Sequence, residues 1–126
     1  MKRFVSASLL CLSLIGGPAL AAESVSVETL ASQIASGKAP LIIDVRTEDD
    51  FLAGRIPGAR LIPHTEIGNY VDSLSAYKDE PILLYCRTGN RSGQAAAVLE
   101  EAGFSKVQVL SESFPGWQAA GQKVQK

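Results

Sequence analysis

Cys86 and the two arginines that follow it, Arg87 and Arg91, are the residues whose types and spacing point most directly to chemistry. Cys86 ends a short apolar run, and a polar loop containing glycine separates it from an alanine-rich helical segment. Backbone N–H groups in such a loop have no partners within the helix, so they converge on whatever lies at its centre. The helix dipole and both guanidinium groups make that centre electropositive, which lowers the pKa of a thiol below the ~8.5 of free cysteine. The pattern predicts a thiolate with an anion bound beside it.

The elements that position this loop alternate between strands and helices. Apolar runs predict strands, at residues 24–27, 41–43, 60–63, 81–85 and 107–110. Capping and breaking residues predict helices between them, at residues 28–36, 47–54, 66–74, 91–102 and 115–120. This alternation indicates an α/β fold with a mostly parallel central sheet and helices on both faces. Ligands of such sheets bind beyond the carboxyl ends of the strands, which is where Cys86 stands.

Residues 1–21 have the pattern of a cleaved export signal. Lys2 and Arg3 are followed by an apolar stretch, residues 4–15, that is shorter than the roughly 18–20 residues needed to span a bilayer. Ala19-Leu20-Ala21 then supplies the small residues read by signal peptidase. We expect cleavage after Ala21 and a periplasmic protein with no stable membrane anchor; an uncleaved anchor is the alternative.

The mature chain, residues 22–126, is expected to form one domain. Loss of Lys2 and Arg3 from 12 basic residues leaves 10 against 13 acidic ones, a balance that argues against nucleic acid as a partner. Cys86 becomes the single cysteine, so no internal disulfide forms and no second thiol resolves a mixed disulfide. One cysteine and one histidine do not make a metal-ligand set, and no cofactor is expected.

Four motifs occur in an order that resembles the rhodanese-like domain, and most closely its single-domain sulfurtransferases. They are Asp44-Val-Arg46, residues 51–59, the loop at 85–92 and Pro115-Gly-Trp117. The resemblance covers about residues 25–121. It implies an α/β sandwich with a central mostly parallel sheet.

The resemblance also implies an activity, the transfer of a sulfane sulfur from thiosulfate or a similar anionic donor. Cys86 would be the nucleophile that carries the sulfur as a persulfide, and the acceptor would be cyanide, a thiol or another protein. Two half-reactions on one thiol predict ping-pong kinetics. The substrate would be held by the loop that follows the nucleophile, formed by Arg87, Thr88, Gly89, Asn90, Arg91 and Ser92.

The remaining site residues are assigned supporting roles. We expect Asp44 and Arg46 to form a structural ion pair or a hydrogen-bonded support near the loop. Gly89 is expected to permit a turn that a Cβ atom would obstruct. Arg91 is expected to bind the anion, whereas Arg87 is left open between attraction of the donor and simple exposure.

Loop length distinguishes sulfurtransferases from related enzymes. Phosphatases and arsenate reductases of this type have five residues between cysteine and arginine, and here four residues separate Cys86 from Arg91. The shorter loop suits a single sulfur anion better than phosphate.

One segment departs from the family pattern. Glu112 and Ser113 stand where related chains often carry two glycines before the tryptophan motif. If this segment lines the site, Glu112 would repel anionic donors. This keeps open the alternative of a low-turnover module that relays sulfur or binds anions or a partner.

Overall fold

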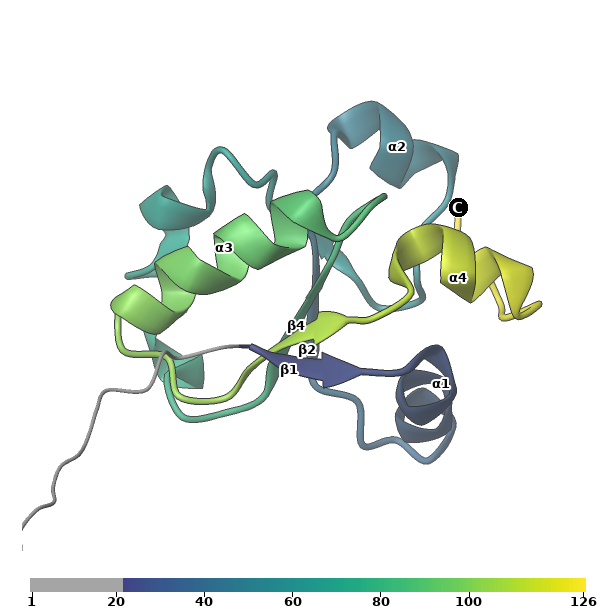
Figure 1. The fold of residues 1–126 in the computed structure, drawn as a ribbon, viewed down its shortest axis with the longest axis horizontal. Helices are drawn as coiled ribbons and strands as arrows, with labels where there is room; N and C mark the ends of the chain where they lie inside the picture. Colours follow the sequence, from purple (N-terminus) through teal and green to yellow (C-terminus); the bar gives the residue numbers. More distant parts are fainter. Residues whose placement is uncertain (1–21) are drawn as a thin grey trace, which may run out of the picture.

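The computed structural model describes residues 22–126, so the predicted signal segment lies outside the described residues. Figure 1 shows one twisted sheet with helices packed against it. The strands are β1 (Glu23–Val25), β2 (Leu41–Asp44), β3 (Arg60–Leu61), β4 (Ile82–Tyr85) and β5 (Val107–Leu110). They lie in the order β1-β5-β4-β2-β3, and all four neighbouring pairs are parallel.

Helices connect these strands. The α-helices are α1 (Val27–Ala35), α2 (Glu48–Ala53), α3 (Asn90–Glu101) and α4 (Ser113–Ala119). Two short 3-10 helices, η2 (Ile67–Tyr70) and η3 (Ser75–Tyr77), lie between β3 and β4. Within residues 22–126, no helix is long and apolar enough to cross a membrane.

The hydrophobic core has two layers, one on each face of the sheet. On one face, Ala96 and Leu99 of α3 pack with Leu84 of β4. On the other, Leu30 of α1 and Trp117 of α4 join a second buried cluster. β4 contributes to both layers because its alternate side chains point to opposite faces. The predicted α/β fold with helices on both faces is therefore confirmed.

Local signals set the helix ends near the site. The Thr47 side chain accepts a hydrogen bond from the Asp50 N–H at 3.2 Å and so caps the start of α2. That helix ends at Ala53, where Gly54 follows in an extended conformation. A capped, short α2 thus follows directly from the end of β2.

The helix predicted at residues 66–74 is wrong. The chain forms η2, a run of turns and then η3, while Ile67 and Leu74 still reach the core. Gly68 and Asn69 are poor helix formers, and two anchoring side chains seven residues apart do not require a continuous helix.

Other predicted boundaries need small changes. The strand predicted at residues 24–27 is β1, Glu23–Val25, and the helix predicted at residues 28–36 begins one residue earlier, at Val27. The strand predicted at residues 60–63 is paired only over β3, although the Ile62 N–H still donates to the Asp44 carbonyl at 3.0 Å. α3 starts one residue earlier than predicted, at Asn90, and α4 starts two residues earlier, at Ser113.

Candidate active site

Cys86 lies at the carboxyl end of β4, immediately before the loop that leads into α3. β4 is a central strand between β5 and β2, and all four of its residues are buried. The Cys86 side chain is itself fully buried. The sheet therefore fixes the thiol at the edge where ligands of parallel sheets bind, as the sequence predicts.

Hydrogen-bond donors surround the sulfur atom. The Gly89 N–H donates to Cys86 Sγ at 2.8 Å and the Ser92 N–H at 3.4 Å, and the Ser92 hydroxyl oxygen lies 3.4 Å from the same atom. The hydroxyl accepts from the thiol and donates its own proton to the Gly89 carbonyl at 3.0 Å, which closes the loop on itself. The loop thus offers donors to a negative charge on sulfur.

The conformation of Gly89 makes this arrangement possible. Its φ of +91° lies in the left-handed region, which glycine adopts without strain. A Cβ at this position would meet only Ser113 Oγ, at 3.6 Å, which is ordinary contact. The turn therefore requires glycine for its backbone conformation rather than for lack of surrounding space, which agrees with the predicted turn.

These contacts change the acidity of the thiol. Burial acts to raise the pKa of Cys86, but hydrogen bonds from Ser92 and from the Gly89 and Thr88 N–H groups outweigh it. The pKa of Cys86 therefore lies below its ordinary value. A larger share of thiolate at neutral pH makes Cys86 a better nucleophile than an unassisted buried thiol.

The two arginines of the loop have different surroundings. Arg87 is 65% exposed, and its Nη2 pairs with Asp50 Oδ1 at 2.7 Å. Arg91 is exposed, and within residues 22–126 it forms no ion pair. Thr88 and Asn90 are exposed as well, whereas Ser92 is buried. No pattern in the sequence points to a role for Asp50, which lies 37 residues from Arg87 along the chain.

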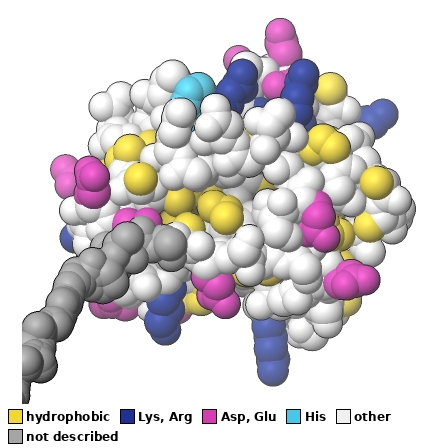
Figure 2. Space-filling view, viewed as in Figure 1, with side chains coloured by type: hydrophobic (Ala, Val, Ile, Leu, Met, Phe, Trp, Pro, Cys, Tyr) yellow, Lys and Arg dark blue, Asp and Glu magenta, His cyan; other side chains and the backbone are white. Residues whose placement is uncertain are grey.

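Two hollows adjoin the loop, and both are lined by Asp50 and Arg87. One, of about 420 Å³, is also lined by Arg91 and Thr88, and we call it the arginine hollow. The other, of about 300 Å³, is also lined by Phe114, and we call it the aromatic hollow. Figure 2 shows basic and acidic side chains gathered together over α2 and the start of α3.

The predicted ion pair between Asp44 and Arg46 is present and buried. Arg46 Nη2 lies 2.7 Å from Asp44 Oδ2, and it also donates to the Gly54 carbonyl at 2.7 Å. Burial acts to lower the pKa of Arg46, but the hydrogen bond and charge of Asp44 raise it above its usual range. The pair joins the end of β2 to the end of α2, and neither side chain is hydrogen-bonded to Cys86.

Tyr85 completes this support, and sequence reasoning missed it. Its hydroxyl donates to Asp44 Oδ2 at 2.8 Å and accepts from the Ile56 N–H at 3.1 Å. Burial and the nearby Asp44 carboxylate raise the pKa of Tyr85 well above its ordinary range, so the hydroxyl stays neutral. The residue before Cys86 is therefore fixed to β2 and to the segment after α2.

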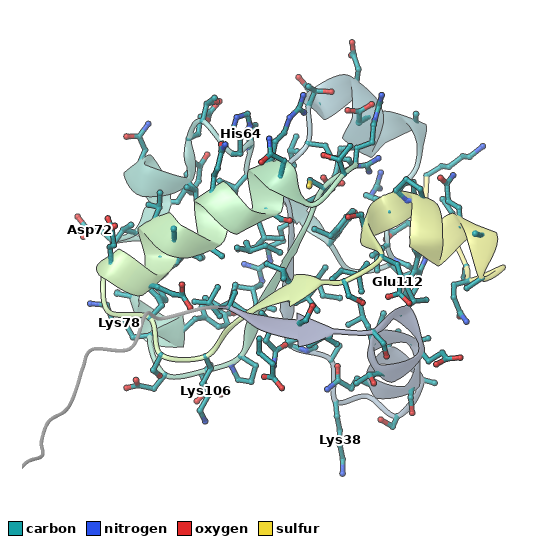
Figure 3. The ribbon with its side chains drawn as sticks, viewed as in Figure 1. Lys38, His64, Asp72, Lys78, Lys106 and Glu112 are labelled. Carbon is teal, nitrogen blue, oxygen red and sulfur yellow. The ribbon has the colours of Figure 1, made fainter. Side chains whose placement is uncertain are left out.

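Glu112 does not lie where the sequence suggested. Its Oε1 accepts hydrogen bonds from the Val27 N–H at 3.1 Å and from the Ser111 hydroxyl at 2.6 Å, so it caps the start of α1. Figure 3 places it beside α1 and α4, and it lines neither hollow. Because Glu112 does not line the site, it is not placed to repel anionic donors.

Ser113, rather than Glu112, faces the loop. It is buried, and among residues 22–126 it is the only residue other than glycine with positive φ, at +61°. The next N–H, that of Phe114, donates to the Cys86 carbonyl at 3.0 Å. The departure from the family pattern pointed to this segment, but the sequence did not indicate that Ser113, rather than Glu112, faces the loop.

His64, the one histidine of the chain, is hydrogen-bonded to the residue after β2, although 22 positions separate it from Cys86. Its N–H donates to the Val45 carbonyl at 3.0 Å, which places it at the same edge of the sheet as the loop (Figure 3). The residue is half-buried.

In the part of the chain that the structure describes, no group of three or more His, Cys, Asp and Glu side chains is placed to hold a metal ion.

Comparisons with known proteins agree with this architecture. The Rhodanese-like domain family matches residues 26–120. Among curated proteins, the chain is 33% identical to Uncharacterized protein YibN of Escherichia coli K12 over 88 residues, which are 69% of this chain and 62% of YibN. It is 32% identical to Thiosulfate sulfurtransferase GlpE of Pseudoalteromonas translucida over 68% of this chain and 81% of that protein.

A solved structure extends the comparison to the fold. The human single-domain sulfurtransferase TSTD1 is similar with a TM-score of 0.69 and 25% identity. The similarity covers 78% of this chain and 96% of TSTD1.

Proposed function

This chain belongs to the rhodanese-like family, and we propose that it is a sulfurtransferase whose Cys86 accepts sulfur from thiosulfate or a similar anionic donor. The observation that carries the proposal is the set of donors around Cys86 Sγ, at 2.8 Å from Gly89 and 3.4 Å from Ser92. Relatives named sulfurtransferase support sulfur transfer in general, and the name of GlpE supports thiosulfate as the donor.

In the first half-reaction, the Cys86 thiolate attacks the outer sulfur of thiosulfate. A new S–S bond forms to Cys86, the S–S bond of thiosulfate breaks, and sulfite leaves with the bonding electron pair. The product is a persulfide whose outer sulfur carries the negative charge. N–H groups of the loop stabilise this charge in the same way as they stabilise the thiolate.

In the second half-reaction, a thiophilic acceptor attacks the outer sulfur of the persulfide. With cyanide, thiocyanate forms and the Cys86 thiolate is regenerated. Neither step needs a proton to be removed from the nucleophile when the thiolate is preformed. This agrees with the lowered pKa of Cys86, and Asp44 and Arg46 act as supports rather than as a catalytic pair.

Initial rates measured over a grid of thiosulfate and cyanide concentrations test the proposal. Because the donor product leaves before the acceptor binds, double-reciprocal plots should give parallel lines. Cys86→Ser should abolish turnover, whereas the exposed Ser73→Ala, made as a control, should not. Intersecting lines, or a Cys86→Ser variant that still turns over, would contradict the mechanism. Sulfur uptake without turnover would favour the relay alternative.

Export to the periplasm is also part of the proposal, and it rests on the sequence of residues 1–21 alone. The mass of the protein recovered from a periplasmic fraction should correspond to residues 22–126. A full-length mass in that fraction, or retention in the membrane, would contradict cleavage.

A further inference from the structure

Asp50 is held in place where it meets Arg87. The Thr47 hydroxyl donates to Asp50 Oδ2 at 3.0 Å, and Asp50 Oδ1 accepts from Arg87 Nη2 at 2.7 Å. Only 22% of the Asp50 side chain is exposed, against 65% of Arg87. The carboxylate is therefore the anchored member of the pair, and the long arginine side chain is the member that can move.

The ion pair stands between the two hollows that adjoin the loop after Cys86. Asp50 and Arg87 line both of them, whereas Arg91 lines only the arginine hollow. Arg87 thus directs its charge toward a carboxylate of this chain, and Arg91 faces the hollow with no ion-pair partner among residues 22–126. The two loop cations are therefore not equivalent toward an incoming anion.

We propose that Asp50 determines the charge selectivity of the Cys86 site by pairing with Arg87 and so offsetting its charge toward an incoming anion, which leaves Arg91 as the main attracting cation. Asp50 is in this sense a positioning residue that acts through Arg87. The identity of the anion rests on the proposed function, whereas the test below needs only a reactive thiol.

This arrangement suits a reaction in which one anion enters and another leaves. Thiosulfate and the sulfite that it releases are both anions, so a site with two unopposed arginines would also retain the product. Retention of the product would slow its release, a step that limits turnover in many enzymes. By occupying Arg87, Asp50 limits the attraction to one cation at the arginine hollow.

Alkylation of Cys86 by two reagents measures this selectivity directly. Iodoacetate is an anion and iodoacetamide is neutral. The rate with iodoacetate divided by the rate with iodoacetamide therefore cancels changes in the thiol itself and reports the charge that the reagent meets. At low ionic strength, Asp50→Asn should raise this ratio on the order of threefold, because a carboxylate is lost and Arg87 is released. Asp49→Asn is the matched control, since Asp49 also lines the arginine hollow but forms no ion pair.

The same measurement in an Arg87→Gln background separates positioning from simple loss of charge. If Asp50 acts by holding Arg87, Asp50→Asn should have a larger effect with Arg87 present than without it.

The inference is wrong if Asp50→Asn and Asp49→Asn raise the ratio equally, or if both reagents accelerate together. It is also wrong if the effect is unchanged without Arg87. Thiosulfate turnover with an unaltered ratio would overturn this inference alone, and an altered ratio without sulfur transfer would overturn only the proposed function.

Discussion

At the scale of single residues, Cys86 combines two properties that usually oppose each other. Its side chain is fully buried, which by itself disfavours a charged thiolate. Donors from Gly89 and Ser92 more than offset that cost, and the pKa of Cys86 falls below its ordinary value. Reactivity at this position therefore depends on a few polar contacts made inside an apolar layer.

The contribution of the Ser92 hydroxyl can be isolated with Ser92→Ala. Because this hydroxyl helps to lower the pKa of Cys86, its removal should raise that pKa and shift the alkylation profile to higher pH. The rate of alkylation by iodoacetamide at neutral pH should fall accordingly. Rates measured across a pH series give the midpoint directly, and Ser73→Ala serves as an exposed serine control. A midpoint that stays in place or moves down would show that Ser92 does not stabilise the thiolate.

The sequence predicted the contacts made within one loop but not the contacts between residues that lie far apart in the chain. Gly89 and Ser92 lie within six residues of Cys86, so their roles follow from the geometry of a turn that begins a helix. Asp50 meets Arg87 only because the ends of β2 and β4 lie side by side. Neither residue type nor local spacing indicates that contact.

At the scale of elements, the start of α4 contains a conflict between residue and conformation. Ser113 has a φ of +61°, a conformation that costs a residue with a Cβ roughly 1–2 kcal/mol. The surrounding contacts hold it there, since Ser113 is buried and the Phe114 N–H is bonded to the Cys86 carbonyl. The loop of Cys86 and the start of α4 are therefore coupled through a strained residue.

We predict that Ser113→Gly is more stable than Ser113→Ala by about 0.5–1 kcal/mol. Glycine relieves the positive φ but loses more conformational freedom on folding, so the net gain is smaller than the strain. Urea denaturation of both variants and of the parent protein measures the difference. Since both substitutions remove the hydroxyl, an alanine variant as stable as the glycine variant would contradict strain at this position.

The elements themselves were largely predictable because their signals are local. Leu41 to Asp44 and Ile82 to Tyr85 are short apolar runs, and both are strands. The segment around Ile67 and Leu74 was not predictable, because two buried side chains satisfy the core equally well from 3-10 turns as from a helix. The position of Glu112 depends on α1 and α4 lying together, which is a property of the folded chain.

At the scale of the whole molecule, the parallel sheet brings separate motifs to one edge. Asp44 ends β2, Tyr85 ends β4, and the two residues are paired in register and joined by a hydrogen bond. The motif at residues 51–59 meets them through Gly54 and Ile56. The motifs that define the family in the sequence are therefore largely the supports of one loop, and Cys86 is the point at which they converge.

An intact-mass spectrum of the purified protein before and after thiosulfate tests the central claim most directly. We predict that the protein gains the mass of one sulfur atom, that Cys86→Ser gains none, and that cyanide removes the added sulfur. An unchanged mass with a free, intact Cys86 thiol would contradict thiosulfate as the donor. A gain that persists in Cys86→Ser would contradict Cys86 as the residue that carries the sulfur.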